Sequence, residues 1–280
     1  MIENNNLPLV SIGVPVYNSQ ETISRAISSL LKQSYKNIEI IVSDNLSSDN
    51  TTSIIKLLSE SDKRITHYIQ KKNIGQMPNF QFVLEKSKGE YFFWCSGDDY
   101  WDDSFIEKGI NFFKSNNDYA AVFCYFHLMN NKNNKIIQSF SPPSYNESSS
   151  FKRVVSSINS IHPNLMYSIF KTKVLKEIGG ISPFNYNDVY LISKISSIGK
   201  FHIINEFLHF VGVSGEVRVP YSIDGTKFNL DKYLLKSIKL LFNNIKNLSE
   251  FIIFLYEFPK LVFRIFFYWI KINKRIYKQI

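Results

Sequence analysis

The sequence of 280 residues contains only two cysteines, Cys95 and Cys124, and both lie in apolar runs typical of strands. Two cysteines are too few for a disulfide framework or a four-ligand zinc site, so we predict two buried free thiols. The eleven glycines form neither GxGxxG nor GxxxxGK[ST]. The absence of these motifs argues against a dinucleotide-binding oxidoreductase and against a P-loop nucleotide hydrolase.

Long hydrophobic runs are also missing. The uncharged apolar runs 251–256 and 261–263 are far shorter than the roughly 20 residues that a bilayer-spanning helix needs. The first six residues have no basic stretch followed by an apolar one, so nothing resembles a secretory signal and we expect a cytoplasmic chain. Hydrophobic residues make up 44% and charged residues 20%, values typical of a folded globular protein.

Negative charge is scarce after Thr226, where eleven basic residues accompany three acidic ones. The preceding part is nearly neutral, with 22 basic and 21 acidic residues. Because proteins that act on nucleic acid carry their basic surface around the working site, we predict no nucleic-acid partner. The shift in charge predicts a globular domain over residues 1–226 and a basic helical tail over residues 227–280.

The tail has the pattern of basic amphipathic helices. Pro259 is typical of a first helical position and predicts a helix to about Lys278. Its basic residues fall in one sector of the helix: Lys260, Arg264, Lys271, Lys274, Arg275 and Lys278. The stretch from Asp231 to Leu248 repeats the pattern. One interpretation is docking on an anionic membrane surface, at about 1 kcal/mol for each basic residue. The alternative is a pair of helices that packs on the globular domain or on a second subunit.

The globular part alternates between strand-like and helix-like apolar patterns. Expected strands are 9–15, 38–42, 65–69, 91–95 and 120–126, and expected helices are 23–31, 54–58, 80–84, 105–113, 174–178 and 189–195. We expect a hairpin or loop near the active face over residues 129–150, and a helix stop at Gly179–Gly180. The alternation predicts an α/β fold, a mostly parallel sheet sandwiched by helices.

Polar residues follow the predicted strands. They are Tyr17 and Asn18, Asp44 and Asn45, Asn73 with Gly75, and the run from Ser96 to Asp99. Ligands of open α/β sheets bind beyond the carboxyl ends of the strands, so these residues form the candidate site. The paired carboxylates Asp98 and Asp99 would suit a divalent cation that holds a diphosphate. The alternative for them is an Asp-rich turn that caps the next helix.

Four ordered segments carry a resemblance to a known family: residues 10–18, 39–51, 73–79 and 89–99. They resemble family 2 glycosyltransferases of the GT-A fold. The likeness is specific over residues 9–110, continues more weakly to about Gly215, and ends before the tail. It implies that a hexosyl or deoxyhexosyl group passes with inversion from a nucleotide-diphosphate-sugar donor to an acceptor hydroxyl.

The resemblance also implies roles in donor binding. Asp44 matches the acidic residue that helps hold the nucleobase, and a turn cap is its alternative role. The other implied donor-binding residues are Pro15, Tyr17, Asn18, Asn45, Asn73, Gly75, Asn79 and Asp99. The Asp-Asp-Gly common after the second strand of the family is Asp44-Asn45-Leu46 here.

Metal binding is implied by the match of Asp98 to the last acidic position of the DxD motif, which coordinates Mn²⁺ or Mg²⁺ on the diphosphate. Ser96 occupies the first acidic position, so the ion would have one protein carboxylate fewer. A metal-independent enzyme is the alternative.

The general base implied by the resemblance is Asp188, which matches the acidic residue of the ED motif. The position before it is Asn187 rather than Glu, and an ordinary helix N-cap is the alternative role for Asp188. His209 and Arg218 are the candidates for steadying the leaving diphosphate.

Together these features predict a glycosyltransferase on the inner face of the cell membrane, with a glycan or lipid-linked acceptor, in the synthesis of a cell-surface polysaccharide or lipopolysaccharide. A catalytically degenerate scaffold of the same fold is one alternative, supported by Ser96 and Asn187. A nucleotidyltransferase is another, although residues 9–25 lack a glycine-rich phosphate loop.

Overall fold

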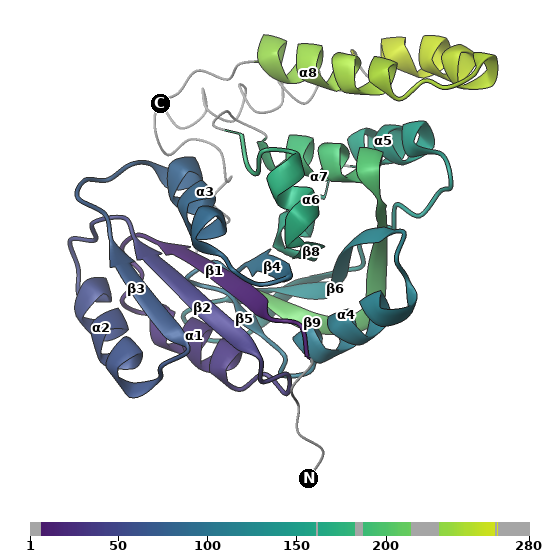
Figure 1. The fold of residues 1–280 in the computed structure, drawn as a ribbon. Coiled ribbons are helices and arrows are strands. Elements are labelled where there is room, and N and C mark those ends of the chain that lie inside the picture. The colour runs from purple at the N-terminus through teal and green to yellow at the C-terminus, as the bar shows by residue number, and fades with distance from the viewer. Residues whose placement is uncertain (1–6, 161, 183–186, 214–229, 261, 263–280) are drawn as a thin grey trace.

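A computed structural model describes residues 7–160, 162–182, 187–213, 230–260 and 262. Within these residues the strands form one nine-stranded sheet with the order β3-β2-β1-β4-β8-β6-β9-β5, and β7 pairs with β6. Figure 1 shows helices on both faces of this sheet, with α1 and α2 on one side and α3, α6 and α7 on the other. The predicted α/β class is confirmed.

The first half of the sheet is parallel. Its strands are β1 (Val10–Val16), β2 (Ile38–Asp44), β3 (Ile65–Ile69) and β4 (Tyr91–Trp94). The helices between them are α1 (Ile23–Leu31), α2 (Thr51–Ser61) and α3 (Gln76–Lys86). Every residue of β1 and β4 is buried, as expected for strands covered on both faces. Parallel pairing brings the carboxyl ends of all four strands to one edge.

The second half of the sheet is mixed. Its strands are β5 (Tyr100–Trp101), β6 (Tyr119–Asn130), β7 (Ile136–Phe140), β8 (Ile169–Lys171) and β9 (Lys200–Val213). The long strands β6 and β9 are parallel, whereas β8 is antiparallel to both β4 and β6, and β5 is antiparallel to β9. Parallel pairing is therefore confined to the first four strands and to β6–β9. The predicted hairpin in residues 129–150 is β6–β7.

The remaining helices of the domain cover the second half. They are α4 (Phe105–Ser115), α5 (Ser150–Asn159), the 3₁₀ helix η1 (Pro163–Tyr167), α6 (Thr172–Glu177) and α7 (Asn187–Ile198). The predicted stop after α6 is confirmed, because Gly179 and Gly180 have φ values of 77° and 66°. Their amides donate to the carbonyls of Lys176 and Leu175 at 3.0 and 2.8 Å, the pairing of a Schellman motif.

Lys194 of α7 secures the same turn. Its ammonium donates to the carbonyl oxygens of Ile178 and Gly180 at 2.8 and 3.3 Å. Burial, together with the positive charge of Lys236, lowers the pKa of Lys194 to about 8. Lys194 of α7 therefore bonds to the turn after α6, and its charge is repelled by that of Lys236 in α8.

Aromatic side chains dominate the main core. Phe92, Phe93 and Trp94 of β4 are fully buried. The Trp94 indole donates to the carbonyl of Phe80 in α3 at 2.9 Å, so its buried N–H is satisfied. Cys95 and Cys124 are buried free thiols, as predicted.

The C-terminal helices pack on the domain through a second apolar cluster. Leu241 of α8 (Leu230–Asn243) joins Phe151, Val154 and Ile158 of α5 and Val189 of α7 in this cluster. On this face, α8 therefore packs on the globular domain, as the second of the two interpretations of the tail predicted. Figure 1 shows α8 lying across α5 and α7.

The predicted helix start at Pro259 is wrong. Residues 248–260 are helical, so Pro259 lies inside the helix. The cap lies upstream, where Asn247 Oδ1 accepts the amide of Glu250 at 3.0 Å. The rest of the predicted helix to Lys278, apart from residue 262, lies outside the described residues. In the described part of the chain, no helix is both long enough and apolar enough to cross a bilayer.

Candidate active site

The loops after β1 and β2 are tied together by their polar side chains. The amide of Asn18 donates to Ser47 Oγ at 2.9 Å, and Asn18 Oδ1 accepts the amide of Ser48 at 2.9 Å. Tyr17 is 49% exposed beside this junction, while Pro15 is buried inside β1. The predicted first donor loop therefore leaves Tyr17 and Asn18 exposed after β1, whereas Pro15 is enclosed in the strand.

Asp44 ends β2 and is fully buried. Its Oδ1 accepts the amide and the hydroxyl of Ser47 at 3.0 and 2.6 Å, and its Oδ2 accepts the hydroxyl of Thr52. Both oxygens thus stabilise the turn into α2, which is the capping alternative.

Leu46 follows with a left-handed backbone, at φ 62°. A branched side chain rarely adopts this conformation, which glycine adopts without strain. Leu46 stands at the glycine of the family's common Asp-Asp-Gly. The left-handed backbone that this glycine would adopt without strain is thus kept here by a leucine.

Asn45 links the end of β2 to the loop after β3. Its Nδ2 donates to Asn73 Oδ1 at 2.9 Å, and its Oδ1 accepts the amide of Ile74 at 2.8 Å. Gly75 has φ 86° and precedes α3. The structure thus brings the predicted residues Asn45, Asn73 and Gly75 together.

Asn79 does not reach this loop cluster. It is buried in α3, where its Nδ2 donates to the Ser43 carbonyl at 2.9 Å and its Oδ1 accepts the Ser43 hydroxyl at 2.6 Å. Its amide holds α3 on β2, so the predicted donor contact is replaced by a structural role.

The acidic loop after β4 holds Asp98 in a defined orientation. The Ser96 hydroxyl donates to Asp98 Oδ1 at 2.6 Å. Burial raises the pKa of Asp98 to about 6, and the charge of Asp99 contributes to this rise. Ser96, at the first position of the DxD motif, thus orients the remaining carboxylate.

Asp99 and His209 form a buried pair that joins this loop to β9. His209 Nε2 and Asp99 Oδ2 are 2.9 Å apart, and Asp99 Oδ1 accepts the amide of Gly212 at 3.0 Å. The His209 ring is fully buried and stacks on Trp101 at 3.8 Å between ring centroids. Both side chains are buried and bonded to each other, and His209 Nδ1 has no hydrogen-bond partner among the described residues. Their predicted diphosphate contacts stay predictions. Arg218 lies outside the described residues.

Arg25 of α1 is a residue that the sequence analysis missed. Its guanidinium donates to the carbonyl of Asp98 at 2.9 Å and to Asn131 and Asn134 of the β6–β7 turn at 2.6 and 2.9 Å. It also lies 4.9 Å from the centroid of the Tyr100 ring. Arg25 therefore clamps the acidic loop to the hairpin. No local motif marks it, because its partners lie far away in the sequence.

Asp188 lies in the first turn of α7 and is 7% exposed. Its Oδ1 accepts the amide of Val189 at 2.8 Å. An acidic group there also interacts favourably with the helix dipole. This local hydrogen bond stabilises the start of α7, and the role of general base stays a prediction.

Tyr167 of η1 is a second residue that the sequence analysis missed. η1 packs against β4 and α7, the elements that lead to Asp98 and Asp188. Burial raises the pKa of the Tyr167 hydroxyl, and the charges of Asp99 and Asp98 raise it further. The charge of Asp188 acts in the same direction. The protonated phenol therefore lies within electrostatic reach of both predicted functional carboxylates.

A divalent cation fits the acidic loop on the chemistry of its donors. A buried carboxylate with a raised pKa is stabilised by a nearby cation, and Asp98 keeps Oδ2 for this purpose. No group of three or more His, Cys, Asp or Glu residues gathers as a metal site in the described ranges. Asp98 would therefore hold the ion together with oxygens of a bound diphosphate.

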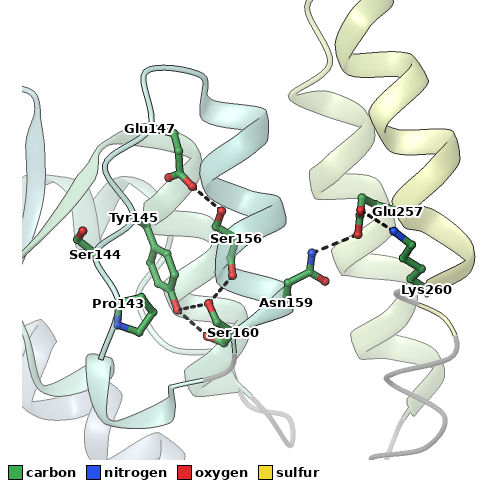
Figure 2. A pocket seen from close by; sticks show the side chains of 9 residues that line it. All are labelled: Pro143, Ser144, Tyr145, Glu147, Ser156, Asn159, Ser160, Glu257 and Lys260. Atoms are coloured by element: carbon green, nitrogen blue, oxygen red, sulfur yellow. Dashed lines mark hydrogen bonds and ion pairs between the residues drawn. The ribbon is translucent and has the colours of Figure 1, made fainter. Parts of the chain in front are cut away.

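A polar groove of about 580 Å³ lies elsewhere, between α5 and the helical residues 248–260 (Figure 2). Figure 2 shows Asn159 donating to Glu257 across it, at 3.3 Å, beside the ion pair of Glu257 and Lys260. None of the predicted site residues lines this groove.

The comparison with protein families identifies the family of this chain. Residues 11–178, more than half of the chain, match the family model described as glycosyl transferase family 2. The chain belongs to glycosyl transferase family 2. The resemblance seen in the motifs is confirmed, and this membership does not favour the nucleotidyltransferase or scaffold alternatives.

Relatives in family 2 include an uncharacterised glycosyltransferase of Rickettsia typhi, 40% identical over 137 residues, which make up 49% of this chain and 42% of that protein. The chain thus spans well under half the length of this relative. An uncharacterised glycosyltransferase of Methanocaldococcus jannaschii is 27% identical over 74% of this chain and 72% of its own length.

Two solved structures are similar in fold. The S. aureus TarS fragment 1–349 in complex with UDP-GlcNAc has a TM-score of 0.63 at 16% identity, over 83% of this chain and 65% of that one. The mannosyltransferase PcManGT from Pyrobaculum calidifontis, in complex with GDP-Man and Mn²⁺, has a TM-score of 0.60 at 15% identity, over 91% of this chain and 70% of that one. The likeness confirms the predicted GT-A fold.

Proposed function

We propose that this family 2 member transfers a hexosyl or deoxyhexosyl group with inversion from a nucleotide-diphosphate-sugar to an acceptor hydroxyl. The observation that carries the proposal is the match of residues 11–178 to the family 2 model, and the structure adds that Tyr167 lies in η1, which packs on both β4 and α7, the elements next to Asp98 and Asp188. A nucleotide-sugar donor is supported by TarS and PcManGT, which are solved with UDP-GlcNAc and GDP-Man.

In the proposed reaction, Asp188 accepts the proton of the acceptor hydroxyl as its oxygen forms a bond to the anomeric carbon. The bond between that carbon and the diphosphate oxygen breaks on the opposite face, and the nucleoside diphosphate leaves with the electron pair. The Tyr167 hydroxyl stays protonated, because burial and the charges of the nearby acids raise its pKa. The loops of Asn18 and Asn45 form the floor of the donor site.

A Mn²⁺ or Mg²⁺ ion held by Asp98 would stabilise negative charge on the leaving diphosphate. The Mn²⁺ in the PcManGT structure supports this assignment. Ser96 and Arg25 serve it by fixing the Asp98 side chain and backbone.

We further propose that the acceptor is a glycan or a lipid-linked glycan, and that the reaction belongs to the synthesis of a cell-surface polysaccharide or lipopolysaccharide at the cytoplasmic face of the membrane. The basic charge excess after Thr226 supports this setting, because anionic lipids attract such segments.

The test is a panel of nucleotide-sugars, with and without Mn²⁺, in which hydrolysis or transfer of the donor is measured for wild type and Asp188→Asn. Loss of general-base catalysis should lower transfer about 10²–10⁴-fold with little change in donor affinity. Asp103→Asn, an exposed acid just past the acidic loop, is the matched control and should keep wild-type turnover.

Near-wild-type turnover of Asp188→Asn would assign Asp188 to helix capping alone, because Asn caps a helix about as well as Asp. Absence of turnover for wild type with every donor, together with nucleotide binding, would favour the scaffold alternative.

A further inference from the structure

The C-terminal helices expose an unusual amount of apolar surface. Seven of the fifteen large hydrophobic side chains that are exposed in the described residues lie between positions 235 and 256. We define the outer face by these residues: Leu235, Phe242, Leu248, Phe251, Ile252, Leu255 and Tyr256. Such concentrations of exposed apolar side chains mark interaction sites, whereas scattered ones do not.

The outer face has the spacing of an amphipathic helix. Leu248, Ile252 and Leu255 recur at intervals of four and three residues, which places them on one side of the helix formed by residues 248–260. Ile253 and Phe254, on the other side, pack against the cluster on α5 and α7. This helix therefore has one apolar side against the domain and a second one toward solvent.

Acidic and basic side chains of these helices also lie on different sides. Glu250 is turned inward, where it accepts the Ser149 hydroxyl at 2.6 Å, and Glu257 bonds to Asn159. Lys239 lies in α8 between Leu235 and Phe242, and Lys239 and Lys246 are both exposed. The carboxylates are consumed by contacts with the domain, so the outer face combines apolar side chains with positive charge.

We propose that the outer face docks the protein on an anionic membrane surface. Apolar side chains inserted among the headgroups and lysines near anionic lipids are the two components of interfacial binding by amphipathic helices. This inference rests on the proposed function in one respect, since it would hold the enzyme beside a lipid-linked acceptor. A second copy of the chain is a poorer occupant, because both copies would bring the same positively charged face into one interface.

The experiment is co-sedimentation of the full chain with vesicles of phosphatidylcholine alone or mixed with phosphatidylglycerol, in the absence of donor. The test variant carries Leu235→Ala, Ile252→Ala and Leu255→Ala, which keep helix propensity and remove exposed apolar area. The control variant carries Leu57→Ala, Ile136→Ala and Ile198→Ala, which remove similarly exposed side chains elsewhere.

We expect binding to phosphatidylglycerol vesicles to fall on the order of tenfold or more in the test variant and to stay at the wild-type level in the control. Lys239→Gln with Lys246→Gln should weaken binding at about 0.1 M salt and much less at about 1 M, where charges are screened. The test variant and the lysine double variant should keep the wild-type melting temperature, because the replaced side chains are exposed.

Equal binding of wild type and test variant would overturn the proposal, as would a wild-type chain that ignores anionic vesicles. A wild-type dimer that the test variant dissociates would assign the outer face to a second copy instead. Because no donor is present, these failures leave the proposed transfer untouched, and Asp188→Asn should bind vesicles like wild type.

Discussion

The loops after β1, β2 and β3 and the acidic loop after β4 lie at the same edge of the sheet but are built on opposite principles. In the first group, Asp44 and Asn45 have their polar atoms paired within the protein. In the second, partial burial and the charge of the neighbouring Asp99 raise the pKa of Asp98. The first group is thus a frame stabilised by its own hydrogen bonds, while the second keeps an electrostatic cost that a bound cation would relieve.

The sharpest test of this contrast replaces one aspartate of each group by asparagine, Asp44 in the first and Asp98 in the second. Asp44→Asn should have the larger effect. Asn cannot accept on both sides, so one of the half-buried donors of Ser47 or Thr52 loses its partner. We expect a loss of about 2–4 kcal/mol in the free energy of unfolding, measured with urea. Glu60→Gln, on the exposed side of α2, is the control and should change stability little.

Arg25→Ala should have the next largest effect. It removes three hydrogen bonds that join the Asp98 backbone to the β6–β7 turn. We expect a loss of about 2–3 kcal/mol in stability and weaker Mn²⁺-dependent nucleotide binding by calorimetry.

Arg25→Lys restores the charge but lacks the planar fork, so it should recover only part of the stability and of the binding. Full recovery by lysine would mean that charge alone, and not the hydrogen-bonded clamp, holds the acidic loop.

Asp98→Asn should change stability in the opposite direction to Asp44→Asn. The pKa of Asp98 is raised to about 6, so the native state binds a proton more tightly than the unfolded chain does. The stability of wild type should therefore be greatest below about pH 4 for this group, fall as the pH rises to about 6, and stay low above it.

At pH 7 and without metal, Asp98→Asn should be more stable than wild type by about 1–3 kcal/mol, with a flatter pH dependence of urea unfolding. The same variant should lose the rise in melting temperature that Mn²⁺ with a nucleoside diphosphate gives wild type. Destabilisation at pH 7 would contradict the electrostatic cost assigned to this loop.

Leu46→Gly should give the smallest effect, a gain of about 0.5–1 kcal/mol. Glycine relieves the left-handed backbone at φ 62°, and part of that gain is lost to the greater freedom of the unfolded chain. Leu57→Gly in α2 is the matched control, and it should destabilise because its backbone is helical.

Much of the fold could be predicted from the sequence, because long apolar patterns specify β1 to β4 and the helices that follow them. The short strands β5 and β8 could not, since two or three residues show no periodicity and depend on neighbours β9 and β6. Pro259 gave a wrong helix start because the Asn247 cap outweighs it.

The sequence predicted which residues lie at the candidate site but not which residues they contact. Motifs placed the polar residues at the strand ends, but they could not show that Asp99 bonds to His209 or that Asn79 bonds to Ser43, because those partners lie far apart in the sequence. Tyr167 and Arg25 were missed for the same reason. Whether a polar residue faces a ligand or the protein depends on its partners in space.

Lys194 offers a use that follows from its surroundings. A lysine whose pKa is about 8 is substantially deprotonated under mildly alkaline conditions, when other lysines stay protonated, and a neutral amine is a nucleophile. An acylating reagent applied near pH 8 should therefore modify Lys194 early wherever it gains access. If α8 leaves the domain, Lys194 loses the repulsion from Lys236, its pKa rises, and the fraction of neutral amine at that pH falls. The pH at which labelling of this side chain is half-maximal, followed by peptide mass spectrometry, would then report whether the C-terminal helices are attached.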